Sequence, residues 1–305
     1  MAELDLGQLL AIGERAAFHG PPAQAVQALE QAVGVARDSG RTAEATAASW
    51  LLGLSLNAAG RYGHAIEVLR PLLETGEQPA PPPENRLFGA LAGATLGSVY
   101  RQLGMHTVAR TMDERGLALT DGTGEPAFAC RIGLAADAVG LGESATAHEH
   151  SDAAALLLPE RPTEWWRQRV RYDWVRTEIA LLDEDTDGAL DAADSAVERA
   201  ERARAPRHVA KSLLFLGVAQ LQLGMEAGPQ SLRRAATLAE GLGALPLVWP
   251  SRALLGALVM DEDEVEGAAS LGAARSAVLT IAGNLPADLR DTWLARPDLA
   301  ALLEG

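Results

Sequence analysis

Residues 96–104 read Leu96-Gly97-Ser98-Val99-Tyr100-Arg101-Gln102-Leu103-Gly104, and Ala109 follows five positions later. An apolar residue followed by glycine recurs at Ile12-Gly13, Leu52-Gly53, Ile132-Gly133, Leu216-Gly217 and Leu255-Gly256. The register places one further unit at Thr177. The spacings are then 40, 44, 36, 44, 40 and 39 residues. Seven units at a nearly constant spacing predict an array of structural repeats.

The residue types in this pattern suit a pair of packed helices. A glycine in the first helix allows the second helix to approach closely, and the turn glycine supplies a left-handed cap. A small residue near the start of the second helix would fill the gap, at Ala25, Ala65, Ala109, Ala145 and Ala189. One such pair is too thin to bury its own apolar face, so neighbouring pairs must stack.

The pattern resembles the tetratricopeptide repeat (TPR) in a divergent bacterial form with units of about 40 residues. The resemblance implies an all-α fold: a right-handed superhelix of about seven antiparallel helix pairs, a TPR-like α-solenoid. We expect one domain over residues 1–305. Its units lie near 6–40, 43–76, 86–121, 125–158, 163–205, 208–243 and 247–283, with a C-terminal capping helix over 285–304. The proline-rich stretch 79–83 is expected to be a surface loop, and the alternative is a proline-motif ligand.

Composition agrees with a helical protein and narrows its partners. Apolar residues make up 48% of the 305 residues and aromatic residues 4%, and the formal net charge is −15. Such a charge argues against direct binding to nucleic acid or to an anionic membrane surface. The single cysteine, the absence of signal-peptide features at the start and the lack of a long apolar stretch predict a cytoplasmic protein.

Few side chains suggest chemistry. His148 and His150 are two residues apart, so on a helix their rings diverge and a metal site is disfavoured. Cys130 lies beside Ala127 and Phe128, which favours a packed thiol over a nucleophile. We therefore expect no enzyme, no catalytic residues and no cofactor.

The acidic segment 183–194 matches the spacing of a calcium-binding loop. Its candidate ligands include Asp183, Asp185, Asp187 and Asp194, with Gly188 at the sharp turn. The repeat register offers another explanation, a turn between two helices with acidic residues near a helix N-terminus. We favour the turn and keep the four aspartates as a weak metal candidate.

The segment 165–176 concentrates tryptophan and arginine. On a helix, Trp165, Arg169, Tyr172 and Arg176 share one face, and Trp166, Val170 and Trp174 share another; we expect only one face to belong to the core. Two interpretations stay open. The aromatic residues either replace the missing small-residue packing of this unit or form a recognition surface.

The TPR resemblance also implies that the first helices of successive units line a concave groove. By register, its partner-binding residues would be Trp50, Asn57, Arg101, Asp137, Arg171, Trp174, Glu178 and Lys211, together with Leu54, Gln102 and Leu214. The leading hypothesis is a non-enzymatic scaffold that binds a peptide or partner protein in this groove. The alternative is the sensor module of a bacterial signalling or transcription system that binds a small effector. Homodimerisation is left open.

Overall fold

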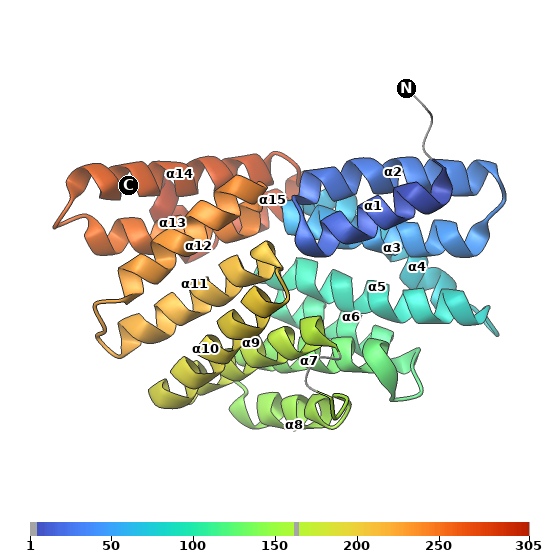
Figure 1. Cartoon of the computed structure of the whole chain (residues 1–305), viewed down its shortest axis with the longest axis horizontal. Coiled ribbons are helices and arrows are strands. Elements are labelled where there is room, and N and C mark those ends of the chain that lie inside the picture. The colour runs from blue at the N-terminus through green and yellow to red at the C-terminus, as the bar shows by residue number, and fades with distance from the viewer. Residues whose placement is uncertain (1–4, 162–164, 305) are drawn as a thin grey trace.

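The computed structural model describes residues 5–161 and 165–304. The first two residues of the predicted fifth unit, 163 and 164, lie outside the described residues, as do residues 1–4. The described part contains sixteen α-helices and no strand, so the all-α fold class is confirmed (Figure 1). None of these helices is long and apolar enough to cross a membrane. The bounds are α1 Leu6–His19, α2 Pro22–Asp38, α3 Thr42–Ala59, α4 Tyr62–Gly76, α5 Pro83–Gln102, α6 His106–Ala118, α7 Gly124–Gly140, α8 Ser144–Ala155, α9 Trp166–Leu182, α10 Thr186–Arg202, α11 Pro206–Gln222, α12 Gly228–Leu242, α13 Leu245–Val259, α14 Glu264–Ala282, α15 Ala287–Leu294 and α16 Pro297–Glu304.

Local sequence signals set these helix ends. Asp5 caps α1, and the Gln8 side chain accepts a hydrogen bond from the Asp5 backbone in return. Proline occupies the first turn of α2, α5 and α11, where it costs no intrahelical hydrogen bond. Gly60 ends α3 in the left-handed conformation, with φ of 78°. The proline-rich stretch 79–83 lies in the connection between α4 and α5, and its last residue, Pro83, begins α5.

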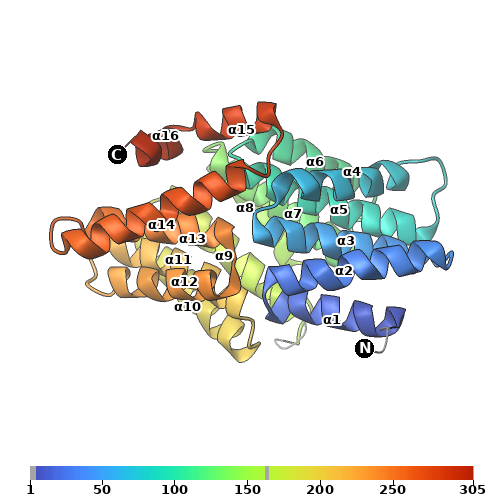
Figure 2. The ribbon, with the colours of Figure 1, turned by 90° about the horizontal axis from the view of Figure 1, so that it is seen from above.

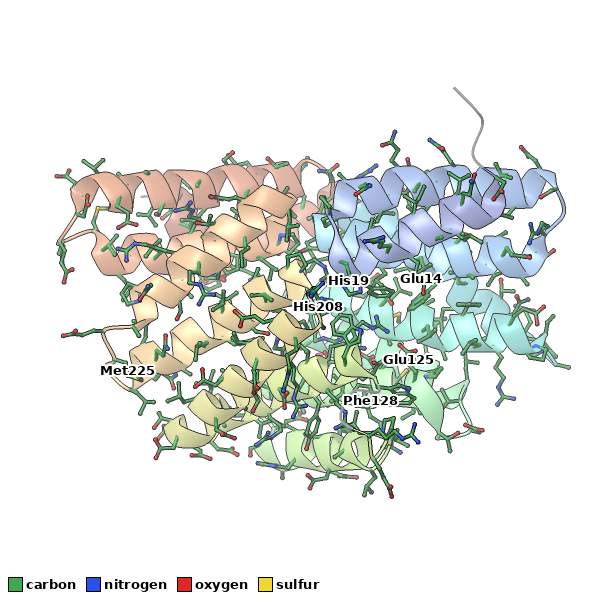
Figure 3. All side chains as sticks on the ribbon, in the orientation of Figure 1. Glu14, His19, Glu125, Phe128, His208 and Met225 are labelled. Atoms are coloured by element: carbon green, nitrogen blue, oxygen red, sulfur yellow. The ribbon has the colours of Figure 1, made fainter. Side chains whose placement is uncertain are left out.

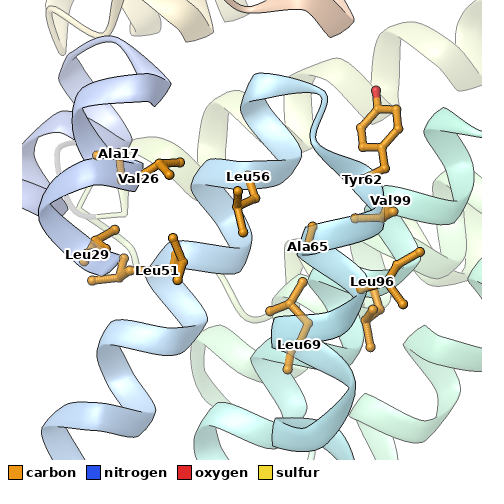
Figure 4. Packing of buried hydrophobic residues seen from close by; sticks show 14 of the residues in the cluster. Ala17, Val26, Leu29, Leu51, Leu56, Tyr62, Ala65, Leu69, Leu96 and Val99 are labelled. Atoms are coloured by element: carbon orange, nitrogen blue, oxygen red, sulfur yellow. The ribbon is translucent and has the colours of Figure 1, made fainter. Parts of the chain in front are cut away.

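The repeating glycines allow the two helices of a pair to approach closely, as predicted. A Cβ atom built at Gly13 would lie 2.5 Å from Leu29 Cδ2, and Leu29 is fully buried. The other glycine and leucine pairs with this arrangement are Gly53 with Leu69, Gly217 with Leu232 and Gly256 with Leu271. Figure 4 shows Leu29, Leu51, Leu69 and Leu96 among the buried side chains packed between successive helices.

The small-residue prediction is confirmed where the turn has the standard length. Ala25, Ala65, Ala109 and Ala189 are each the fourth residue of a second helix and are fully buried. The prediction was wrong in the fourth unit, where Ala145 is exposed and the buried residue is Ala147. The reason is that α7 extends seven residues beyond its repeat glycine, against five for α5, which displaces the next helix by two positions.

The array curls until its last helices meet its first ones (Figures 1 and 2). The Tyr62 ring of α4 contacts the Trp293 ring of α15 edge-on, with centroids 6.4 Å apart. His19 Nδ1 at the end of α1 lies 3.3 Å from the Arg204 carbonyl oxygen, beyond α10. One hydrophobic cluster therefore joins α1–α6 to α14–α16. The chain forms a closed superhelix around a central groove.

The C-terminal segment differs in detail from the single capping helix expected over 285–304. It forms two short helices, α15 and α16, and the break falls at Ala295 and Arg296, because the residue before a proline disfavours the helical conformation. Trp293 is fully buried, and Arg296 Nη1 donates to the Gln102 carbonyl oxygen at 3.2 Å. These two helices therefore cover the second and third helix pairs as well as the end of the array.

Candidate functional site

The central groove has a volume of about 370 Å³ and is lined mainly by the first helix of each pair, from α3 to α13. Seven of the eight predicted partner-binding residues line it. They are Trp50, Asn57, Arg101, Arg171, Trp174, Glu178 and Lys211. Leu54 and Gln102 line it too, whereas Leu214 packs into the hydrophobic core beside α12 and α13. The eighth residue, Asp137, is fully buried and reaches the groove only through Arg101.

Arg101 is held between two buried carboxylates. Its Nη1 atom lies 2.6 Å from Asp113 Oδ2 and 3.0 Å from Asp137 Oδ1, and it donates to the Gly133 carbonyl oxygen at 3.1 Å. Both aspartates are completely buried. The charge of Arg101 is therefore compensated inside the protein, which makes this residue a structural link between α5, α6 and α7 more than a free anchor for a ligand.

Asp113 is not among the predicted site residues, although the repeat contains a signal for it. Asp113 follows Gly97 by sixteen residues, the spacing that separates Leu29 from Gly13 and Leu69 from Gly53. The carboxylate fills the space left by Gly97 and also faces Gly133 of the next pair. An aspartate at an otherwise apolar repeat position indicates a buried ion pair.

Burial governs the ionisation of this ion-pair cluster. Burial raises the pKa of Asp113 well above its usual value, and the neighbouring Asp137 carboxylate raises it further, while Arg101 opposes both effects. The pKa of Asp137 is also raised, again chiefly by burial. Two carboxylates that share one guanidinium cannot both ionise without cost.

Three other cations in the groove have no ion-pair partner among the described residues. Arg171 lies on α9, and Arg207 and Lys211 lie one turn apart on α11. By contrast, the remaining arginines of the lining are paired, Arg167 with Glu125 and Arg296 with Asp298. Among the described residues, Glu178 is the only acidic residue of the lining. The groove is therefore cationic within a chain whose net charge is −15.

Burial among like charges disfavours the protonated forms of these groups. It lowers the pKa of Arg171 to about 10 and that of Arg207 to about 10, and in both cases Arg167 adds repulsion. Burial also lowers the pKa of Lys211 to about 8, although Glu178 opposes this effect. An anionic ligand would reverse all three shifts, because a nearby negative charge favours the protonated forms.

The Lys211 ammonium group packs against the Trp174 ring, which in turn stacks on His208. The ammonium Nζ lies 4.4 Å from the centre of the Trp174 ring, and the His208 ring stacks on Trp174 at 5.5 Å with an interplanar angle of 16°. Trp174 is 7% exposed, and its Nε1 donates to Ser212 Oγ at 2.8 Å. Figure 3 shows His208 near His19 at the centre of the molecule, and Trp166 contacts both rings.

Three further lining residues, Arg167, Arg207 and His208, are also absent from the predicted groove positions. Arg167 shares a helix face with Arg171, Trp174 and Glu178, at spacings of four, seven and eleven residues. Arg207 precedes Lys211 by one turn. The repeat register that identified Arg171 and Lys211 could therefore also have identified Arg167 and Arg207.

The expectation that only one face of the tryptophan and arginine segment 165–176 belongs to the core was wrong. Both faces of α9 pack, because this helix lies between two parts of the core. Val170 and Trp174 belong to a cluster with α10 and α11, and Trp166 packs against it. Trp165 and Tyr172 pack against α7 and α8. The segment therefore supplies core packing, and Trp174 in addition contributes an edge to the groove.

The acidic turn has local hydrogen-bond partners. The Asp185 carboxylate caps α10 by accepting from the Gly188 amide at 3.0 Å. The Asp183 carboxylate accepts from Ser144 Oγ at 2.6 Å and lies 2.7 Å from His148 Nε2. Within residues 5–161 and 165–304, no group of three or more histidine, cysteine, aspartate or glutamate side chains is placed to hold a metal ion, so Asp187 and Asp194 join no such group. Cys130 is buried, and burial raises the pKa of its thiol well above the usual value, as expected for a packed cysteine.

Comparison with solved structures shows the fold. A Rap protein complexed with competence and sporulation factor superposes with a TM-score of 0.64 at 11% identity, over 97% of this chain and 79% of that one. The yeast Tom70 gives a TM-score of 0.45 at 13% identity, over 100% of this chain and 68% of that chain. No family model and no curated protein matches the sequence. At this identity the likeness to the Rap protein concerns the fold alone.

Proposed function

We propose that this protein, a TPR-like helical-repeat superhelix, is a binding scaffold that takes an acidic, extended peptide segment in its central groove. The observation that carries the proposal is the group of three cations, Arg171, Arg207 and Lys211, which form no ion pair within the described part of the chain and gather on the concave surface of a strongly acidic protein. Carboxylates of a ligand are the natural counterions for such groups.

Burial makes the unpaired cations of the groove energetically costly. A cation held in a partly buried groove without a partner destabilises the free protein, because it loses hydration and gains no ion pair. A ligand carboxylate would restore that interaction. The Rap structure, in which a protein of the same fold is complexed with a factor, supports the view that such an array can hold a partner.

The shape of the groove favours an extended ligand. Its lining draws on α3, α5, α7, α9, α11 and α13, so a bound segment would contact several helix pairs in succession. Asn57 and Gln102 are also in the lining and could form hydrogen bonds with peptide amides. A small anionic effector is the second candidate, because a volume of about 370 Å³ also falls in the range of small-molecule sites.

Selection from a displayed library of random nonapeptides tests the proposal. Acidic residues should be enriched, and Arg171→Ala or Arg207→Ala should weaken binding of a selected peptide by about tenfold or more. Arg37→Ala is the matched control, because Arg37 is an exposed arginine of α2 outside the groove. Its loss should leave the affinity within about twofold.

Two results would contradict the proposal. Selection without acidic enrichment would show that an acidic peptide is not the ligand. An equal effect of all three arginine variants would indicate non-specific charge attraction. A melting-temperature shift caused by small dicarboxylates, together with failure of the peptide selection, would favour the effector hypothesis.

A further inference from the structure

A second hollow, with a volume of about 750 Å³, opens beside the central groove. Its walls come from α1, α3, α5, the first turn of α7 and the start of α9, five segments of the chain. Aromatic side chains dominate its lining. They are Phe18, Trp50, Phe88, Trp165 and Trp166, and all five are partly exposed.

These rings are held in defined contacts. The Trp50 and Phe88 rings lie 5.9 Å apart, and Trp50 Nε1 donates to Thr95 Oγ1 at 3.2 Å. The Arg167 guanidinium carbon lies 4.8 Å from the centre of the Phe18 ring. Arg167 is also paired with Glu125, which lines the same hollow, so the charge of Arg167 is compensated there.

The hollow adjoins the groove. Trp50 and Arg167 line both of them, so the two sites share a border at these side chains. The two parts differ in character. Three cations without an ion pair among the described residues lie in the groove, whereas the hollow combines apolar ring surface with the charged side chains of Glu14, Arg15 and the Arg167–Glu125 pair.

We propose that the aromatic hollow is a second subsite, which takes an aromatic or large aliphatic side chain of the peptide whose acidic residues occupy the groove. This inference rests on the proposed function. Apolar anchors that enter aromatic pockets dominate the energetics of many interfaces. A concave site that shares Trp50 and Arg167 with the groove fits a side chain on the same peptide better than a flat partner surface, so we commit to that occupant.

The test uses peptides selected against the wild-type protein as above. They should carry an aromatic or large aliphatic residue at a fixed distance from the acidic residues. Replacing that residue by alanine should weaken binding about tenfold, and the double variant Phe18→Ala/Phe88→Ala should weaken binding of the parent peptide by a similar factor. The double variant should bind the alanine-substituted peptide as the wild type does, since the shared contact is already lost. Leu87→Ala is the matched control, because this exposed neighbour of Phe88 lies outside the hollow.

The outcomes separate this inference from the proposed function. Acidic enrichment without a recurring apolar residue would overturn the subsite and leave the acidic-peptide groove intact. An equal loss of binding to both peptides in Phe18→Ala/Phe88→Ala would show that the rings act through the fold, and would also overturn the subsite. A concentration-dependent dimer in sedimentation, abolished by the double variant, would assign the hollow to a second copy of the chain instead. Failure of acidic enrichment itself would remove the proposed function.

Discussion

Arg101 illustrates how one side chain can line a groove without being free to bind there. Its guanidinium is held by Asp113 and Asp137, and both of these carboxylates are buried. Removing the cation would leave two buried carboxylates without a counterion. Removing one carboxylate charge would leave a balanced ion pair.

We therefore expect Arg101→Ala to lower the free energy of unfolding by about 3–5 kcal/mol, because it breaks a buried ion pair. Asp113→Asn should not lower stability at pH 8. The raised pKa of Asp113 means that the folded state holds the proton of this carboxyl group more tightly than the unfolded state does. Wild-type stability therefore falls as the pH rises from the pKa of Asp113 in the unfolded state to its pKa in the folded state. Urea denaturation at several pH values measures both effects. A large loss of stability in Asp113→Asn at pH 8 would contradict this account.

Lys211 makes binding sensitive to pH. Glu178, Arg101, Arg171 and Arg207 act on its ammonium group, and burial lowers its pKa to about 8. An acidic ligand would raise that pKa, so binding takes up a proton near pH 8 and weakens as the pH rises from 7 to 9. For one proton, linkage limits the change to about tenfold per pH unit.

Lys211→Arg should flatten this pH dependence, because arginine keeps its charge over the whole interval. Fluorescence anisotropy with a selected acidic peptide at pH 7, 8 and 9 is the measurement. If the variant and the wild type show the same slope, then Lys211 does not face the ligand.

At the scale of helices, the glycine and leucine contact fixes how closely each pair packs. Gly13→Ala should lower the free energy of unfolding by about 1–3 kcal/mol, because the new methyl group would overlap the buried Leu29 side chain. Gly34→Ala on α2 is the matched control. Beyond the adjoining backbone of its own helix, no atom of the described residues lies within 4 Å of a Cβ built at Gly34, so this change should stabilise the protein by about 0.5–1 kcal/mol.

Chemical denaturation of the two variants checks this prediction. Equal effects of Gly13→Ala and Gly34→Ala would mean that the repeat glycine reflects composition and has no role in close packing. Helix propensity alone predicts that both substitutions stabilise, so the sign at Gly13 decides the matter.

At the scale of the whole molecule, the closed superhelix links the two ends of the chain. Trp293 is fully buried against Tyr62, and Ile281 of α14 lies against Gly60 of α3. Contacts between the ends make an array of nearest-neighbour repeats behave more like a globular domain, in which distant segments support each other.

Trp293→Ala should therefore lower the free energy of unfolding by about 3–5 kcal/mol. It should also raise amide hydrogen exchange in α3 and α4, far from the substitution in sequence. Leu279→Ala is the control, because Leu279 of α14 is 56% exposed. Faster exchange confined to α15 and α16 would show that the closure does not stabilise the first pairs.

The sequence alone determined the helix pairs, and the TPR resemblance implied which helix of each pair lines the groove. The pairs follow from short-range spacing, since the repeat glycines and the 3.6-residue period fix which residues share a face. Seven of eight groove positions were located in this way from Trp50 to Lys211.

Only the tertiary structure decided which groove charges are compensated. Arg101 and Arg171 look alike in the sequence, yet one is paired with carboxylates 12 and 36 residues away and the other lacks an ion-pair partner in the described part of the chain. The aromatic hollow and the junction of Tyr62 with Trp293 likewise depend on how far the superhelix curls. The accumulated angle between successive pairs sets that curl, and no single unit encodes it, because each small rotation depends on packing against its neighbours.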